Sequence, residues 1–176
     1  HWLKNRAILD EIAELAHTDE ADLALEIGPG LGTLTSSLLK GFNRVVAVEY
    51  DERLAQNLPK SFPGKNLEVI NADILKFDFD NIAERYVVAG NIPYYITSPI
   101  IEKILTTKNV PVKVVLLVQK EVAERIADEK ETMLSLFVKN RASVALGPIV
   151  PKGEFTPPPK VDSRVIVLAP HASGHD

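Results

Sequence analysis

Apolar positions along the chain follow two alternating spacings. In some segments they recur every three or four residues, which predicts helices, and in others they form short continuous runs, which predict buried strands. The predicted helices cover residues 3–16, 33–39, 51–58, 97–105, 122–126 and 133–138. The predicted strands cover residues 23–27, 44–48, 67–71, 86–90, 112–118, 142–150 and 164–168. Alternation of nearly continuous apolar strands with helices is typical of a parallel sheet covered on both faces.

The end of the chain departs from this alternation. Residues 142–150 and 164–168 are predicted strands separated only by the loop 151–163, which favours an antiparallel hairpin at the sheet edge. A mostly parallel, doubly wound α/β sheet with a terminal hairpin is the Rossmann-like architecture of class I methyltransferases. We expect residues 1–170 to form this single domain and residues 171–176 to be a linker or a chain end.

Composition and charge restrict the possible partners. The chain has 176 residues, 45% of them apolar, which is enough for the core of one domain. It contains no cysteine, which excludes disulfides and thiolate metal sites and is consistent with a reducing, cytoplasmic compartment. No apolar run reaches the roughly 20 residues that cross a bilayer, and no ligand cluster predicts a metal site. The formal net charge of −4 disfavours phosphate binding unless basic residues gather on one face or another domain supplies them.

A glycine-rich turn, with Gly28, Gly30 and Gly32, follows the first long predicted strand. Glycines at this point let the backbone turn tightly and approach a ligand at a helix N-terminus. The third glycine comes one residue earlier than in the dinucleotide pattern G-x-G-x-x-G, which favours S-adenosylmethionine over a pyrophosphate. The same spacing, with no evident hydride-transfer site, argues against a nicotinamide-dependent oxidoreductase. The alternative for the turn alone is a tight connection without a ligand.

Acidic residues follow the next two predicted strands. Glu49 lies about 20 residues beyond the glycines, the spacing of an acid that accepts hydrogen bonds from ribose hydroxyls. Asp73 can accept from the adenine amine of the cofactor, with Ile74 against the adenine ring. A merely solvated Glu49 and a capping or turn role for Asp73 are the alternatives.

The segment Asn91-Ile92-Pro93-Tyr94 follows the fourth predicted strand. An adenine N6 amine is a poor nucleophile because its lone pair is delocalised into the ring. Two acceptors that hold the amine hydrogens, the Asn91 side-chain oxygen and the Ile92 carbonyl, would draw the nitrogen towards tetrahedral geometry. Pro93 fixes the turn, and Tyr94 offers a face on which a flipped-out base stacks. The alternative is an Asn-Pro-type turn with a core tyrosine.

This segment resembles the Asn-(Leu/Ile)-Pro-Tyr motif of ribosomal RNA adenine N6-dimethyltransferases. Residues 155–163 resemble the late loop of that family, residues 118–125 resemble another of its segments, and His1-Trp2-Leu3 is similar to the end of its Gln-x-Phe-Leu motif. The resemblance implies that Phe155 stacks on the face of the target adenine opposite Tyr94. It further implies that S-adenosylmethionine is bound by His1, Leu3, Gly28, Gly30, Glu49, Asp73, Ile74 and Asn91.

The resemblance also implies a reaction and a partner. The expected reaction is methyl transfer to the N6 amine of adenine in small-subunit ribosomal RNA, with dimethylation of adjacent adenosines near its 3′ end during subunit maturation, by a monomeric enzyme. Family members continue into a small helical domain that holds RNA, and this domain is expected to be absent here, so we expect weak, salt-sensitive RNA binding. Late basic residues suit an RNA groove or a solvated face equally: Lys120, Arg125, Lys139, Arg141, Lys152, Lys160 and Arg164.

Three other functions compete with this one. The macrolide-resistance methyltransferases carry out the same chemistry on large-subunit RNA and share Asn-Ile-Pro-Tyr, but the triple proline at 157–159 followed by Lys160 is more similar to the small-subunit enzymes. A DNA adenine methyltransferase would more often carry Asp-Pro-Pro-Tyr. The third alternative is a mainly non-catalytic ribosome-assembly factor, although Asn91 and Tyr94 argue against lost activity.

Overall fold

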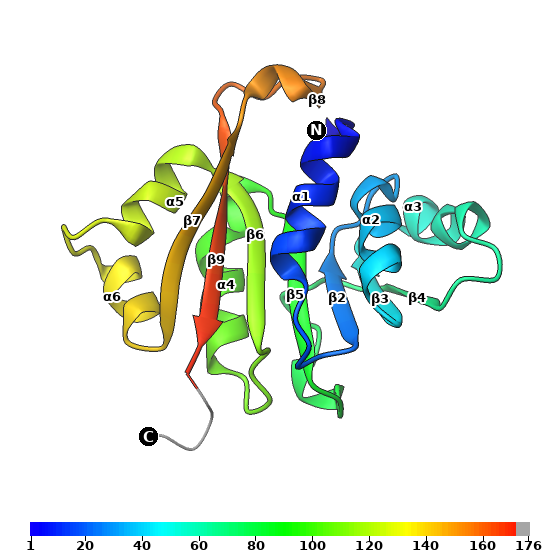
Figure 1. Cartoon of the computed structure of the whole chain (residues 1–176), viewed down its shortest axis with the longest axis horizontal. Helices are drawn as coiled ribbons and strands as arrows, with labels where there is room; N and C mark the ends of the chain where they lie inside the picture. The colour runs from blue at the N-terminus through cyan, green and yellow to red at the C-terminus, as the bar shows by residue number, and fades with distance from the viewer. Residues whose placement is uncertain (172–176) are drawn as a thin grey trace.

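In this computed structural model, which describes residues 1–171, seven strands form one sheet in the order β4-β3-β2-β5-β6-β9-β7 (Figure 1). β2 to β6 run parallel, and β9 is antiparallel to both of its neighbours. The strands are β2 (Leu23–Ile27), β3 (Arg44–Glu49), β4 (Leu67–Asn71), β5 (Tyr86–Asn91), β6 (Lys113–Gln119), β7 (Ala142–Val150) and β9 (Ser163–Pro170). The predicted mostly parallel α/β sheet is confirmed.

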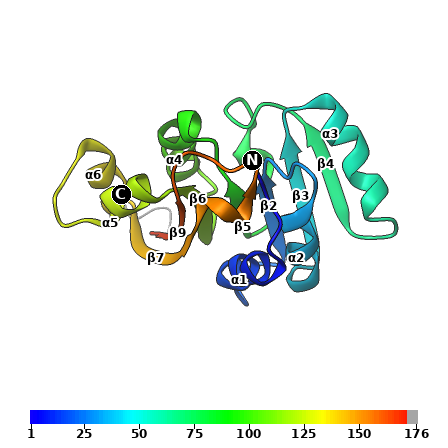
Figure 2. The same cartoon turned by 90° about the horizontal axis from the view of Figure 1, so that it is seen from above.

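Helices cover both faces of this sheet. They are α1 (Arg6–Ala16), α2 (Thr33–Gly41), α3 (Glu52–Asn57), α4 (Thr97–Thr106), α5 (Lys120–Ala127) and α6 (Met133–Lys139). Figure 2 shows α1 and α2 on one side of the central strands and α4 on the other. Side chains alternate accordingly, since Leu25 belongs to the core under α4 and the neighbouring Ala24 to the core under α1 and α2. Both cores are apolar, so the burial of two sheet faces stabilises the arrangement.

The terminal strands form the predicted antiparallel hairpin. β7 pairs with β9 from Ala142 opposite Pro170 to Val150 opposite Ser163, with a register shift between Leu146 and Ile149. β9 inserts between β6 and β7, so β7 is the edge strand. Beyond the hairpin, the His171 N–H donates to the Arg141 carbonyl at 2.8 Å, and the remainder of the predicted linker, 172–176, lies outside the described residues.

The start of the chain differs from the prediction. The helix predicted from residue 3 begins at Arg6. Asn5 caps it, because its side chain accepts hydrogen bonds from the first-turn N–H groups of Ala7 and Ile8. Trp2–Leu3 is instead a short strand, β1, paired antiparallel with β8 (Phe155–Thr156). Leu3 fits the helical spacing of apolar residues because it is buried. It is buried as part of strand β1, however, and not as part of the helix.

Candidate active site

The carboxyl ends of the parallel strands bring the predicted motifs to one edge of the sheet. The register places Ile27 beside both Val48 and Gly90, so the residues that follow β2, β3 and β5 emerge together. The Gly28 N–H extends this pairing by donating to the Val48 carbonyl at 2.9 Å. Ligands of open α/β sheets bind at this edge. In Figure 1 this edge lies at the top, beneath β8 and the N-terminus.

The glycine turn adopts a backbone conformation that residues other than glycine rarely adopt. Gly28 and Gly30 have φ values of 62° and 57°, and a Cβ on Gly30 would overlap the indole ring of Trp2. A Cβ on Gly28 would lie 4.0 Å from the backbone oxygen of Asn91, so the turn is adjacent to the predicted catalytic strand end. Sequence reasoning did not single out the contact between Trp2 and the turn.

Gly90 is a second residue that sequence reasoning missed. A Cβ at this position would lie 2.7 Å from the carbonyl oxygen of Ile27. Glycine therefore permits the close approach of β5 to β2 directly before Asn91. A glycine at the end of an otherwise apolar strand was the available signal.

Glu49 is buried, and both of its carboxylate oxygens accept backbone hydrogen bonds. Oε1 accepts from the Gly30 N–H and Oε2 from the Asp51 N–H, each at 3.0 Å. The acid thus ties the glycine turn to the end of β3. Asn71 supports this arrangement because its side-chain N–H groups donate to the carbonyl oxygens of Glu49 and Tyr50 at 2.9 and 3.1 Å.

Asp73 forms the turn that the sequence allowed as one alternative. Its Oδ1 accepts from the Leu75 N–H at 3.0 Å, and its carbonyl accepts from the Lys76 N–H at 2.9 Å. Among residues 1–171, no hydrogen bond uses its second carboxylate oxygen. Ile74 is buried in the core. The turn role leaves one carboxylate oxygen of Asp73 for a ligand.

The segment after β5 is rigidly held and leaves its key acceptors unused. The Ile92 N–H donates to the Leu117 carbonyl at 3.0 Å, and the Pro93 carbonyl accepts from the Ile96 N–H at 3.1 Å and the Thr97 hydroxyl at 3.2 Å. Within the described part of the chain, no hydrogen bond involves the Asn91 side chain or the Ile92 carbonyl. Two acceptors at the sheet edge are therefore preorganised for a donor from outside.

Tyr94 is not a core tyrosine. Its side chain is 68% exposed, and the ring of Tyr95, 71% exposed, meets it edge-on with centroids 5.8 Å apart. The alternative of a buried tyrosine is excluded, and the exposed ring can support a stacked base.

The predicted partner of Tyr94 is placed differently. Phe155 is only 3% exposed and packs in the core that contains Leu3, its partner across β1 and β8. The predicted sandwich of an adenine between Tyr94 and Phe155 is therefore not assembled in this conformation, because protein atoms cover the Phe155 ring. Strand pairing and apolar burial fix that ring in the core.

The two predicted N-terminal cofactor residues, His1 and Leu3, form hydrogen bonds with other parts of the chain. Leu3 is buried, and its carbonyl accepts from the Thr33 hydroxyl at 2.9 Å. His1 is exposed, and its Nδ1 donates to the Pro157 carbonyl at 2.8 Å. The side chain that reaches the turn is Trp2, between them.

Glu26 is a buried acid beneath the glycine turn that sequence reasoning left without a role. Burial raises its pKa to about 8, the hydrogen bond from the Thr35 hydroxyl lowers it, and the charge of nearby Glu49 raises it. At neutral pH its carboxyl is therefore largely protonated. Its bond to Thr35 fastens α2 to β2 directly behind the turn.

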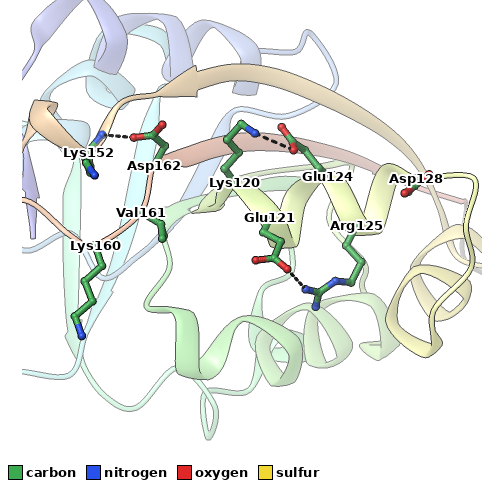
Figure 3. Close-up of a pocket in the computed structure, with 9 residues that line it drawn as sticks. All are labelled: Lys120, Glu121, Glu124, Arg125, Asp128, Lys152, Lys160, Val161 and Asp162. Carbon is green, nitrogen blue, oxygen red and sulfur yellow. Dashed lines mark hydrogen bonds and ion pairs between the residues drawn. The ribbon is translucent and has the colours of Figure 1, made fainter.

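A charged groove with a volume of about 670 Å³ lies between α5 and the loop before β9 (Figure 3). Its basic residues differ in their partners. Lys120 pairs with Glu124 at 3.1 Å and Arg125 pairs with Glu121 at 2.8 Å. The amines of Lys152 and Lys160 form no ion pair with any of residues 1–171. Figure 3 shows the Lys160 side chain extending away from the acids of α5.

The other predicted basic residues do not line this groove. The Lys139 amine donates to the Asp128 carbonyl, and the Arg141 guanidinium stacks 3.8 Å from the centroid of Phe137. Arg164 lies beside the groove and pairs with Glu124 at 2.8 Å. The net charge of −4 is thus compatible with local cationic positions at Lys152 and Lys160.

The described residues include neither a metal-binding cluster nor a membrane-spanning helix. Residues 1–171 contain no group of three or more His, Cys, Asp or Glu side chains arranged to hold a metal ion. None of the helices in the same range has the length and apolar character needed to cross a membrane.

Comparison with known proteins gives consistent matches over nearly the whole chain. The ribosomal RNA small subunit methyltransferase A of Dehalococcoides mccartyi is 39% identical over 174 residues, covering 96% of this chain and 60% of the relative. The chain therefore spans less than two thirds of that relative. A dimethyladenosine transferase from Plasmodium falciparum superposes with a TM-score of 0.88 at 37% identity, covering 97% of this chain and 64% of the other.

A second solved structure, the 23S rRNA methyltransferase ErmE, superposes with a TM-score of 0.89 at 31% identity, covering 98% of this chain and 71% of the other. These likenesses confirm the predicted fold of S-adenosylmethionine-dependent methyltransferases. The family model described as ribosomal RNA adenine dimethylase matches residues 1–175. With that match and the 39% identical relative, this chain belongs to the ribosomal RNA adenine dimethylase family.

Proposed function

We propose that residues 1–170 form the catalytic domain of an enzyme that methylates the N6 amine of adenine in small-subunit ribosomal RNA, with S-adenosylmethionine as methyl donor. The observation that carries this proposal is the segment after β5. It combines two acceptors without partners in the described chain, Asn91 and the Ile92 carbonyl, with the exposed ring of Tyr94. The backbone of Asn91 lies next to the glycine turn, 4.0 Å from the position of a Cβ on Gly28.

The residues at the sheet edge fit the cofactor. Gly28 in the turn is exposed, and the Glu49 carboxylate keeps lone pairs for ribose hydroxyls beyond its two backbone hydrogen bonds. The second oxygen of Asp73 can accept from the adenine amine. When bound there, S-adenosylmethionine would supply the electrophilic methyl group.

The chain's own contribution to the reaction is to hold the target amine. The Asn91 side-chain oxygen and the Ile92 carbonyl accept the two amine hydrogens, which localises the nitrogen lone pair and aims it at the methyl group. Pro93 and the hydrogen bonds to its carbonyl keep both acceptors in place without reorganisation during the reaction. Tyr94 stacks on the flipped-out base.

The groove beside α5 is the surface on which the RNA would bind. Lys152 and Lys160 carry the cations without ion-pair partners in the described chain, and phosphate neutralisation by such residues supplies much of the affinity for RNA. On this proposal, the enzyme works as a monomer in the cytoplasm and dimethylates adjacent adenosines near the 3′ end of the RNA during subunit maturation.

Large-subunit RNA is the second candidate substrate, because ErmE, with a TM-score of 0.89, is a 23S rRNA methyltransferase. The small-subunit substrate is favoured by the 39% identical relative, a ribosomal RNA small subunit methyltransferase A, and by the prolines at 157–159. The test is incubation with methyl-labelled cofactor and each ribosomal RNA, followed by mass spectrometry of the digested RNA. Dimethyladenosine in small-subunit RNA is expected. Labelling of large-subunit RNA alone would reverse the substrate, and binding without methylation would favour an assembly factor.

A further inference from the structure

Lys103, on α4, reaches across to the loop that follows β4. Its amine donates to the Leu75 carbonyl at 2.7 Å and lies 5.9 Å from the ring centroid of Phe79. The helix that carries it is firmly seated, since Ile100 and Ile104 on either side are fully buried. Lys103 is therefore a fixed anchor for a segment far from it in sequence.

The Leu75 peptide groups are held from both directions. The Leu75 N–H donates to Oδ1 of Asp73 at 3.0 Å, and the Leu75 carbonyl accepts from Lys103. One carboxylate oxygen of Asp73 is thus tied to a residue whose position the lysine fixes. The other carboxylate oxygen is the one that is proposed to bind a ligand. Its orientation therefore depends on the same contact between Lys103 and Leu75.

The loop that contains Leu75 has little regular secondary structure. Residues 72–85 connect edge strand β4 to β5 and contain only the short 3₁₀ helix Phe79–Asn81. Phe77 packs edge-on against Phe79 at 5.3 Å between centroids, directly below the Lys103 amine. Buried Ile74 and Phe79 and the hydrogen bond from the Lys76 N–H to the Asp73 carbonyl also hold this loop, and the bond from Lys103 joins the Leu75 carbonyl to α4.

We propose that Lys103 is a positioning residue that sets the Asp73 carboxylate for recognition of the cofactor's adenine amine. The inference rests on the proposed function, in which Asp73 accepts from that amine. Lys103 touches neither the cofactor nor the target base. Its loss loosens the turn and weakens the discrimination that Asp73 provides.

The test uses two probes that differ at the adenine amine. S-adenosylhomocysteine carries the amine, and S-inosylhomocysteine carries a carbonyl in its place, which cannot donate to Asp73. Calorimetry gives the affinity of each probe for the wild-type chain, Asp73→Ala, Lys103→Met and Lys103→Arg. Lys108→Met is the matched control, because Lys108 is exposed and follows the same helix, and no hydrogen bond or ion pair joins its amine to residues 1–171.

We expect Lys103→Met to weaken the binding of S-adenosylhomocysteine by roughly three- to tenfold. This is part of what a hydrogen bond to a charged group contributes. Binding of S-inosylhomocysteine should be unchanged. Lys103→Arg retains a donor and should restore most of the preference, and Lys108→Met should match the wild type. Asp73→Ala should abolish the preference between the probes.

The other outcomes separate the two proposals. Full preference in Lys103→Met together with its loss in Asp73→Ala would overturn the role of Lys103 and leave the site intact. Equal weakening of both probes in Lys103→Met would mean general loss of structure, which also overturns the positioning role. Full preference in Asp73→Ala would remove Asp73 from the adenine site and the inference with it.

Discussion

The Gly30 N–H donates a hydrogen bond to a carboxylate oxygen of Glu49 over 3.0 Å. This bond joins the turn after β2 to the end of β3, so the acid predicted to bind ribose also holds the glycine turn in its left-handed conformation. On the proposed function, cofactor binding and the shape of the turn are therefore coupled through one side chain.

Replacing Glu49 should weaken cofactor binding more than the loss of a single ribose contact would. Glu49→Ala removes acceptors for the ribose hydroxyls and the tie to Gly30. A hydrogen bond to a charged group contributes about 1.5–3 kcal/mol, so we expect roughly a 10- to 100-fold rise in the Kd of S-adenosylhomocysteine by calorimetry. Glu11→Ala, on the exposed side of α1, is the control. Unchanged affinity would remove Glu49 from the cofactor site.

Asn91→Ala should slow methyl transfer without a comparable loss of RNA binding. The variant loses one of two preorganised acceptors for the amine, and loss of one such polar group costs on the order of 10²–10³ in rate. Single-turnover transfer of a labelled methyl group to ribosomal RNA measures this. A chelator should leave the wild-type rate unchanged, and a chelator-sensitive rate would require a different mechanism.

Tyr94→Ala should lose base stacking, and Tyr94→Phe should retain it. Stacking of a base on an aromatic side chain contributes about 1–3 kcal/mol, and Tyr94 is 68% exposed. The measurement is RNA affinity by fluorescence anisotropy, combined with the transfer rate. If Tyr94→Phe were as inactive as Asn91→Ala, the hydroxyl would have a chemical role.

Phe155 provides the contrast to Tyr94. Because its ring is in the core, Phe155→Ala should lower the free energy of unfolding by about 3–5 kcal/mol, measured by urea denaturation. Phe155→Leu keeps most of the apolar volume and should recover much of that loss. A fully stable Phe155→Ala chain with reduced activity would restore the originally predicted stacking role.

Glu26 should make stability depend on pH. Burial raises its pKa from 4.5 to about 8 in the folded chain, so between those pH values the folded state holds a proton that the unfolded state has released. The free energy of unfolding should therefore be greatest below pH 4.5 for this group and fall as pH rises to 8, by at most about 1.4 kcal/mol per pH unit. Glu26→Gln, which keeps an acceptor for Thr35, should flatten this decline in urea titrations. Exposed Glu11→Gln should not.

Lys152 and Lys160 should contribute to RNA affinity through phosphate contacts. Each alanine substitution should reduce the slope of log affinity against log salt by about 0.7 for single-stranded RNA. It should weaken the binding of RNAs of unrelated sequence to the same extent. Titration of one ribosomal RNA fragment at several salt concentrations measures the slope. Lys65→Ala, an exposed lysine before β4, is the control. Equal slopes in all variants would place the RNA elsewhere.

Much of the fold was predictable because the buried strands are nearly continuous apolar runs and each is closed by a polar or glycine residue. Glu49 and Asn91 could be assigned to strand ends for this reason, and the parallel register then brings those ends to one edge. Local periodicity also predicted the helices, and Asp51 caps α3 by accepting from the Leu54 N–H, in line with the preference for Asp at this position.

By itself, the sequence determined the order of strands and helices, the glycine turn and the Asn91–Tyr94 segment, since these depend on neighbouring residues. Only the tertiary structure decided that Leu3 and Phe155 pair across β1 and β8, because a contact between the two ends of a chain leaves no local periodic signal. It also decided that Tyr94 is exposed while Phe155 is buried, and that Glu26 is protonated at neutral pH. Burial and charge environment are properties of the packed chain, and no single segment contains them.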